Sequence, residues 1–337
     1  MRRLFSSIVG FTAILLLFTQ PIHASCGSAN CFLVTGTQEG IATPGQLVLD
    51  LSYRWIPMDR AQRGSDRISE AVVPGIDFEN GRIIPTDQAG AHREFRTNNE
   101  LAQADISYGV TERFALTLAI PFLNNRWHEH DHRQSNGSFG NFQRQDSANG
   151  FGDLRLNGKY ALWVSTRHLL VGGVGVKTPT GEYKLLNHDG AINEPTIQPG
   201  TGSWDGIASV YYAYQIIPHQ FDTFFSSSYQ ITTQNDLKYQ FGNTLLLNGG
   251  VNTRFGENRN VIGSLQVNLR QTPRDEFRGR EVPSTGGLWV YLTPGVKVQA
   301  SPNTALYVHL QLPLYQKVND ENLVPRYGLI LGISHAF

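Results

Sequence analysis

The chain has 337 residues, and its 28 basic and 28 acidic side chains give a formal net charge of zero. This balance, together with a sequence that contains neither a basic patch nor a nucleic-acid-binding motif, excludes nucleic acid as the partner. The length suits one large domain or two ordinary ones, and all-β barrels of this size commonly fold as single domains.

The first 24 residues predict a secretory signal peptide. Two arginines follow Met1, an apolar stretch runs from Leu4 to Phe18, and Ala24 ends a cleavage site of small residues. We therefore exclude residues 1–24 from the fold. The apolar stretch is short for a membrane helix, and no later stretch approaches the roughly 18 to 20 apolar residues that such a helix needs. The sequence predicts an exported protein of a Gram-negative cell that has no membrane helix.

Residues 25–45 are expected to form a short periplasmic segment that contains both cysteines of the chain, Cys26 and Cys31. Disulfides persist in exported proteins, which favours a small Cys26–Cys31 loop. A metal site built on these two cysteines is the alternative, although structural zinc normally takes four ligands. Lipidation of Cys26 is disfavoured because His23 stands where a lipoprotein signal has an aliphatic residue.

From Leu47 onward the dominant pattern is an alternation with a period of two. Apolar residues recur at every second position between Leu47 and Trp55, while the intervening positions include Asp50 and Arg54. The pattern returns in segments of about ten residues, near the 9 to 11 that a tilted strand needs to cross a bilayer. It predicts twelve strands, near 46–57, 98–109, 113–124, 150–163, 168–178, 203–215, 221–232, 238–254, 259–271, 286–299, 303–316 and 325–337.

The connections between these strands alternate in length. Tight turns near 109–112, 164–166, 217–219, 256–258 and 301–303 separate long polar connections at 58–97, 125–149, 179–202 and 272–285. Short periplasmic turns and long external loops are typical of outer-membrane barrels. Residues 46–337 are therefore expected to form one antiparallel up-and-down barrel with both chain termini in the periplasm.

Proline and aromatic residues mark the expected strand ends. Proline cannot donate to a strand ladder, so Pro294, which lies inside an expected strand, predicts a β-bulge. Aromatic rings near strand ends are typical of the membrane surface. The aromatic residues expected there are Tyr53, Trp55, Phe122, Trp127, Tyr160, Trp163, Tyr214, Phe221, Tyr229, Tyr239 and Tyr315.

Periodicity alone leaves a secreted β-sandwich open, because its strands alternate in the same way. The last segment ends at Phe337 after alternating apolar residues, which resembles the signal read by the outer-membrane barrel assembly machinery. This ending favours the membrane barrel. It predicts outer-membrane lipid and, through Phe337, the assembly machinery as partners.

The polar parity of the strands supplies the expected lining of the barrel. These side chains carry both signs of charge. A barrel of about twelve strands is intermediate in width between small barrels, whose interior is filled by side chains, and open porins. A narrow path is therefore expected, with a plugged lumen as the alternative. The expected lumen-lining residues are Asp50, Arg54, Asp105, Asp153, Arg155, Lys159, Lys177, Arg270, Lys297 and His309.

The densest group of metal ligands follows the third expected strand, in Trp127-His128-Glu129-His130-Asp131-His132. In an extended segment His128, His130 and His132 would share one face, where imidazoles could hold copper or zinc. The alternative is a solvated external loop, where such residues are common. No cofactor is otherwise expected.

An outer-membrane hydrolase is the third reading. His132 and Ser135 precede Asn136-Gly137, similar to a stretch of outer-membrane phospholipases. In that family the two catalytic residues are two positions apart and point the same way, whereas here they are three apart and on opposite faces. We therefore expect no catalytic residues and no enzyme.

Five segments carry a family resemblance: Tyr108 to Arg113, Ile120 to Phe122, Gly150 to Leu154, Lys159 to Leu162, and Gly175 to Gly181. They are similar to the outer-membrane family of putative transporters of the MetA pathway of phenol degradation, over roughly residues 45–337. The resemblance implies a barrel for uptake of small, often hydrophobic or aromatic compounds, with Gly152, Asp153, Lys177 and Gly181 as structural signature positions. It brings no catalytic residues. The expected function is an outer-membrane channel for a small molecule.

Overall fold

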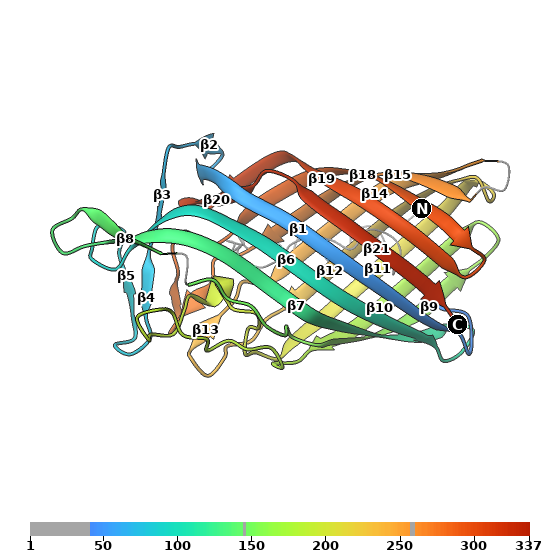
Figure 1. The fold of residues 1–337 in the computed structure, drawn as a ribbon. Coiled ribbons are helices and arrows are strands. Elements are labelled where there is room, and N and C mark those ends of the chain that lie inside the picture. Colours follow the sequence, from blue (N-terminus) through green and yellow to red (C-terminus); the bar gives the residue numbers. More distant parts are fainter. Residues whose placement is uncertain (1–40, 144–145, 257–259) are drawn as a thin grey trace, which may run out of the picture.

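The fold is a closed β-barrel. The computed structural model describes residues 41–143, 146–256 and 260–337. Twelve long antiparallel strands pair in chain order, and pairing of β1 with both β6 and β21 closes the sheet (Figure 1). They are β1 (Leu47–Arg63), β6 (His92–Gly109), β7 (Phe114–Arg133), β9 (Arg155–Val164), β10 (His168–Lys177), β11 (Asp205–Ile217), β12 (Phe221–Ile231), β14 (Thr244–Phe255), β15 (Val261–Thr272), β18 (Gly287–Ser301), β19 (Thr304–Val318) and β21 (Gly328–Ala336).

The barrel separates the two parities of each strand. On β1, Asp50 and Arg54 point inward and are 3% and 4% exposed, whereas Leu51 points outward and is 40% exposed. The outward-facing side chains form an apolar belt. Exposing such a belt to water is unfavourable, whereas the lipid of a membrane solvates it. Exposed members of this belt include Leu162, Val174, Leu265, Leu306 and Ile333. The prediction of a twelve-stranded outer-membrane-type barrel is confirmed.

Three strands are longer than the sequence pattern predicts, and β1 continues to Arg63 instead of ending near residue 57. β6 begins at His92 and β7 continues to Arg133, so parts of the expected loops 58–97 and 125–149 are strand. Cross-strand ion pairs stabilise the extension, with Arg93 Nη2 2.6 Å from Asp131 Oδ2 and Arg96 Nη2 2.8 Å from Glu129 Oε1. Both faces of this segment carry polar residues, so hydropathy does not reveal the strand.

The expected strand 238–254 is interrupted. Tyr239–Gln240 forms the separate short strand β13, and β14 begins at Thr244. A Cβ atom at Gly242 would lie 2.1 Å from the carbonyl oxygen of Pro273, so the chain leaves the barrel wall at this close contact. Tyr239 therefore lies away from the membrane surface, 1% exposed, and its hydroxyl donates to Asp275 Oδ2 at 2.5 Å.

The bulge expected at Pro294 lies elsewhere. The pairs Leu292–Leu312 and Gly295–His309 keep one register between β18 and β19 across Pro294. The register shifts instead between Val290 and Tyr291. The ladder accommodates Pro294 without the extra residue that a bulge inserts.

The long connections form a cap at one end of the barrel (Figure 1). The cap has its own apolar core, in which buried Tyr239, Phe277 and Val282 pack against Ile76 and Phe78. Its short strands are β2 (Asp66–Arg67), β3 (Ala71–Val73), β4 (Gly75–Asp77), β5 (Arg82–Ile84), β8 (Phe139–Gln143), β13, β16 (Glu276–Phe277), β17 (Arg280–Glu281) and β20 (Glu321–Pro325). One 3₁₀ helix, η2 (Pro195–Ile197), lies in the loop between β10 and β11.

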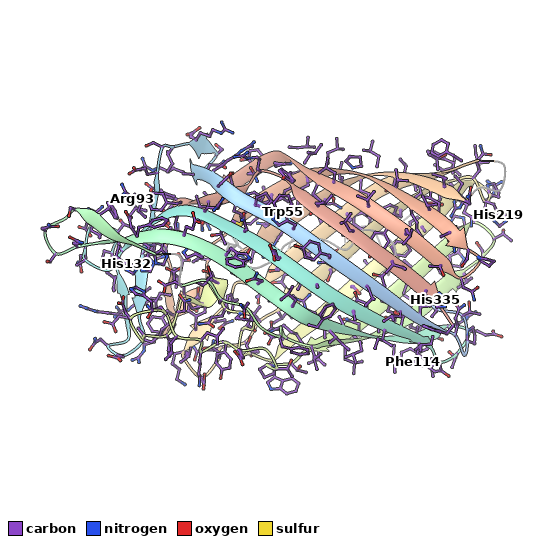
Figure 2. The ribbon with its side chains drawn as sticks, in the orientation of Figure 1. Trp55, Arg93, Phe114, His132, His219 and His335 are labelled. Carbon is purple, nitrogen blue, oxygen red and sulfur yellow. The ribbon has the colours of Figure 1, made fainter. Side chains whose placement is uncertain are left out.

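The tight turns and the C-terminus lie at the opposite end, which we call the turn end. Figure 2 shows His219 and His335 at the turn end and Arg93 and His132 at the cap end. Within the described ranges, no helix combines the length and hydropathy needed to cross a membrane. The expected signal peptide 1–24 and the cysteines Cys26 and Cys31 lie outside the described residues.

Candidate functional site: the lumen and its capped end

The structure places nine of the ten expected lumen residues on the inward parity of their strands, and the tenth, Asp153, lies just before β9. Seven of the ten are buried and three are half-buried. The buried ones are Asp50, Arg54, Asp105, Asp153, Lys177, Arg270 and His309, and the half-buried ones are Arg155, Lys159 and Lys297.

The middle of the lumen is filled by polar side chains that bond to one another. Tyr307 donates its hydroxyl to Asp50 Oδ1 at 2.7 Å, Gln103 donates to Asp105 Oδ1 at 2.9 Å, and Asn268 donates to Asn248 Oδ1 at 2.8 Å. These hydrogen bonds satisfy part of the polar lining, whereas the buried side chains of His309 and Gln311 have no hydrogen-bond partner among the described residues. Polar side chains therefore occupy the middle of the lumen.

Beneath the cap the inward residues become apolar. Ile56, Met58, Trp289 and Tyr291 are each at most 5% exposed and form one cluster with residues of β19 and β20. Ile56 continues the inward parity of Asp50 and Arg54 on β1, so this layer narrows the lumen immediately below the cap. The sequence indicates this apolar layer only weakly, because an apolar residue at an inward position interrupts the alternation of polar and apolar residues.

Among the described residues, the turn end contains a cavity of about 410 Å³ inside the barrel, with Tyr211, Asp222, Arg254, Lys297 and His309 among its lining residues. Arg254 Nη1 lies 2.7 Å from Asp222 Oδ2, which pairs one basic group with the acidic group of this cavity. Asp222 is the only acidic residue among the described residues that line this cavity, whereas Arg167, Arg254 and Lys297 are basic. The lining therefore carries more basic than acidic groups.

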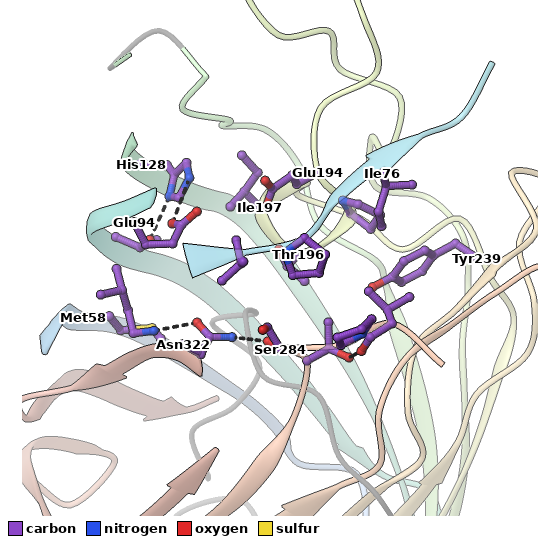
Figure 3. Close-up of a pocket in the computed structure, with 18 residues that line it drawn as sticks. Met58, Ile76, Glu94, His128, Glu194, Thr196, Ile197, Tyr239, Ser284 and Asn322 are labelled. Carbon is purple, nitrogen blue, oxygen red and sulfur yellow. Dashed lines mark hydrogen bonds and ion pairs between the residues drawn. The ribbon is translucent and has the colours of Figure 1, made fainter. Parts of the chain in front are cut away.

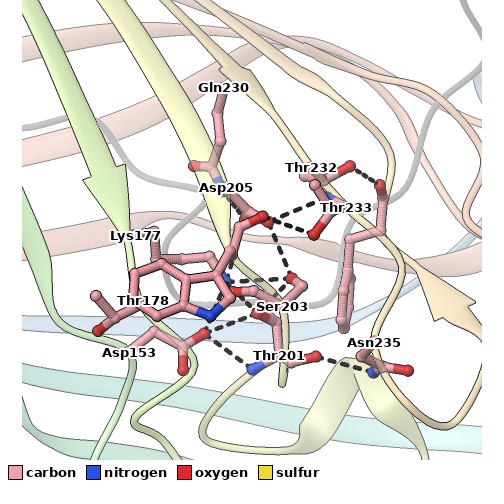
Figure 4. A network of polar contacts seen from close by, with 12 residues as sticks. Asp153, Lys177, Thr178, Thr201, Ser203, Asp205, Gln230, Thr232, Thr233 and Asn235 are labelled. Carbon is pink, nitrogen blue, oxygen red and sulfur yellow. Dashed lines mark hydrogen bonds and ion pairs between the residues drawn. The ribbon is translucent and has the colours of Figure 1, made fainter.

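At the cap end of β10, Lys177 is the centre of a buried polar network (Figure 4). Its ammonium lies 2.9 Å from Asp153 Oδ2 and 3.1 Å from Asp205 Oδ2, and it also donates to the Ser203 carbonyl oxygen at 3.0 Å. Asp153 accepts the backbone N–H of Gly181 at 3.0 Å. The network ties β9, β10 and β11 to the loop between β10 and β11.

Two glycines allow this loop to approach the wall. A Cβ atom at Gly181 would lie 2.8 Å from the backbone of both Gly152 and Gly200. One at Gly152 would lie 3.0 Å from the Pro121 ring. The signature positions Gly152, Asp153, Lys177 and Gly181 thus act together in seating the loop.

The extension of β6 and β7 carries a cluster of histidines and carboxylates. His128, His130 and His132 lie on the inner face of β7, as the alternation predicts, opposite Thr97, Glu94 and His92 of β6. Adjacent rings are in contact: the centroid distance is 4.6 Å for His128 and His130, and 4.7 Å for the stacked rings of His92 and His130.

Sequence reasoning missed five members of the cluster: His92, Glu94, Asp146, His188 and Glu194. His188 and Glu194 belong to the β10–β11 loop, more than fifty residues after the histidines of β7. Asp146 Oδ2 lies 3.0 Å from His130 Nε2, and Asp146 Oδ1 lies 3.1 Å from His188 Nδ1. Glu194 ion-pairs with His92. A His-x-Glu pair at 92–94 was the one local signal that could have found part of the set.

The electrostatics of the cluster are set by burial. Burial, with the neighbouring His130, lowers the pKa of His128 to about 3, and burial lowers that of His132 to about 4, so both imidazoles are neutral at pH 7. Burial, with the nearby Glu194, raises the pKa of Glu94 well above its usual range. Against the opposing effect of burial, His92 holds the pKa of Glu194 down at about 2.

A small cavity of about 60 Å³ adjoins the cluster inside the cap (Figure 3). Glu94, His128 and Glu194 line it together with apolar residues such as Ile76 and Ile197. This volume holds only a few water molecules. This cavity is therefore too small to pass a solute much larger than water.

Comparison with known families gives one match. The model of the family described as "Putative MetA-pathway of phenol degradation" matches residues 86–325. No curated protein matches the sequence significantly.

Among solved structures, the chain is similar to an outer membrane channel from Pseudomonas putida F1, with a TM-score of 0.61 and 12% identity over 90% of this chain and 100% of the other. A TodX deltaS2S3 mutant monoaromatic hydrocarbon channel gives a TM-score of 0.44, 10% identity and coverages of 94% and 98%. A Pseudomonas aeruginosa FadL homologue gives 0.41, 12%, 95% and 99%. At this identity, the first likeness shows a common fold.

Proposed function

The chain belongs to the family described as the putative MetA pathway of phenol degradation, and from this membership we propose that it is an outer-membrane channel for a small molecule. The observation that carries the proposal is a closed barrel with an apolar outer wall, a polar lumen and a cavity of about 410 Å³ at the turn end. We propose that the turn end, with the C-terminus, faces the periplasm and that the cap faces outward.

The cavity favours small anions or compounds that carry one anionic group. Arg167 and Lys297 add positive charge that no acidic residue of the cavity lining balances, because Asp222 is paired with Arg254. Tyr211 and Leu169 supply apolar wall for a ring or a short chain. An excess of basic groups in the lining of a cavity concentrates anions there.

The experiment is conductance in planar bilayers, combined with swelling of liposomes in benzoate, phenol and sugar solutions. The proposed channel gives discrete conductance steps and swells with the small aromatic solutes faster than with disaccharides. A plugged structural barrel gives neither, and that outcome contradicts the proposal.

The proposal also predicts the ion selectivity. Lys297→Gln is expected to lower the anion-to-cation permeability ratio, because it removes one of the basic groups that outnumber the acidic group in the turn-end cavity. The reversal potential under a KCl gradient measures the ratio. Lys184→Gln is the matched control, since Lys184 is paired with Asp236 on the surface of the loop. An unchanged reversal potential in Lys297→Gln would show that this cavity does not select the ions.

Assembly gives a separate prediction through Phe337. Its side chain is 67% exposed, and its backbone N–H donates to the Leu47 carbonyl oxygen at 2.8 Å. Phe337→Ser keeps that hydrogen bond, so we expect unchanged refolding of purified protein in detergent but less heat-modifiable protein in outer membranes. Equal amounts in membranes would argue against recognition of the terminal aromatic ring.

The hydrolase reading loses its support in the structure. Ser135 lies in the exposed turn between β7 and β8, whereas His132 Nε2 lies 3.1 Å from His130 Nε2 inside the cluster. The two side chains therefore lie in different environments.

A further inference from the structure

The cap encloses four potential metal ligands from three separate segments. His92 and Glu94 come from β6, His130 from β7, and Glu194 from the β10–β11 loop. One ligand atom from each lies within 4.8 Å of all the others. Around a tetrahedral zinc ion the ligand atoms are about 3.3 Å apart, because each bond is about 2.0 to 2.1 Å. The four side chains therefore need only a modest contraction to bind one ion.

Unpartnered ligand atoms in the cluster are a second, independent observation. Glu94 is 7% exposed and His130 is 1% exposed. No described residue hydrogen-bonds to Glu94 Oε1 or to His130 Nδ1. Buried polar atoms normally have partners, and a missing ion is one explanation when they do not. Glu94 Oε2 lies 3.3 Å from His128 Nε2, which leaves Oε1 available to bind a metal ion (Figure 3).

The charges of the cluster also favour a bound divalent cation. Glu94 and Glu194 bring two carboxylates into a buried space, where His92 is the direct ion-pair partner of Glu194. A divalent cation bound by two carboxylates and two neutral imidazoles makes the site neutral, and so removes the cost of burying like charges. Imidazole with carboxylate is a donor set that zinc and neighbouring first-row metals accept.

We propose that His92, Glu94, His130 and Glu194 bind one divalent first-row transition metal ion, with zinc as the reference ion. The ion joins the extended wall of β6 and β7 to the β10–β11 loop, which covers the mouth of the barrel. His128 contacts the other carboxylate oxygen of Glu94, Oε2, and so orients that carboxylate. The loop is then held at two points, by the metal at Glu194 and by the Lys177 network at its base.

The test uses the full-length barrel in detergent, stripped with EDTA and titrated with ZnCl2 by isothermal calorimetry, with zinc content measured by mass spectrometry. We expect one zinc ion per chain. Glu194→Gln and His92→Gln each remove one ligand and are expected to weaken zinc binding at least about tenfold. Heat-modifiable gel migration checks that each variant is folded.

The matched control is His219→Asn, which removes a histidine at the turn end. His219 has φ 59°, a conformation that asparagine also tolerates, so this variant should fold and bind zinc as the parent does. A second histidine–carboxylate group, His130 with His132 and Asp146, could hold the ion instead. Zinc binding that survives Glu194→Gln but is lost in Asp146→Asn, or no zinc uptake by the parent, would overturn the proposal.

Discussion

Lys177→Met is expected to destabilise the barrel by about 3 to 5 kcal/mol, the usual cost of removing one partner from a buried ion pair. The Lys177 side chain is 1% exposed, and the side chains of Asp153 and Asp205 are 2% and 1% exposed. Without the ammonium, the two buried carboxylates lose the ion-pair partner that they share. Urea unfolding in detergent, followed by tryptophan fluorescence, measures the loss.

Two further variants make this prediction specific. Combining Lys177→Met with Asp153→Asn and Asp205→Asn removes all three charges and should recover part of the stability, since the cost lies in the unpaired charge. Lys184→Met, at an exposed pair with Asp236, should leave the unfolding curve nearly unchanged. A Lys177→Met protein as stable as the parent would show that the network does not hold the loop in place.

Trp289→Ala is expected to increase the single-channel conductance and to lower stability by about 3 to 5 kcal/mol. Trp289 is 2% exposed and belongs to the apolar layer with Ile56 and Tyr291 beneath the cap. Truncating it to a methyl group widens the lumen at this layer. Conductance in planar bilayers at fixed salt measures the first effect, and urea unfolding measures the second.

Trp163→Ala is the control, because Trp163 is 48% exposed on the outer wall and does not reach the lumen layer. It removes the same indole group without widening the path, so its conductance should equal that of the parent. Equal conductance in Trp289→Ala and the parent would place the narrowest point elsewhere, in the polar middle of the lumen or in the cap.

Sequence periodicity, together with the terminal Phe337 that favoured a membrane barrel over a β-sandwich, was sufficient to predict the barrel. A barrel wall has two unlike faces, so outward residues such as Leu51 are apolar and inward residues such as Arg54 are polar. A closed up-and-down antiparallel barrel also needs an even number of such strands. The same alternation placed nine of the ten lumen residues on the inward face. It also put His128, His130 and His132 on one side of β7.

What only the tertiary structure decided is how the long connections pack. The ends of β6 and β7 are polar on both faces, so alternation of hydropathy could not show that His92 and Glu94 lie in a strand. Glu194 joins His130 because the loop is seated through Lys177, Asp205 and the close approach at Gly181. Such contacts join residues far apart in the chain, and their pairing depends on backbone positions that no local pattern encodes.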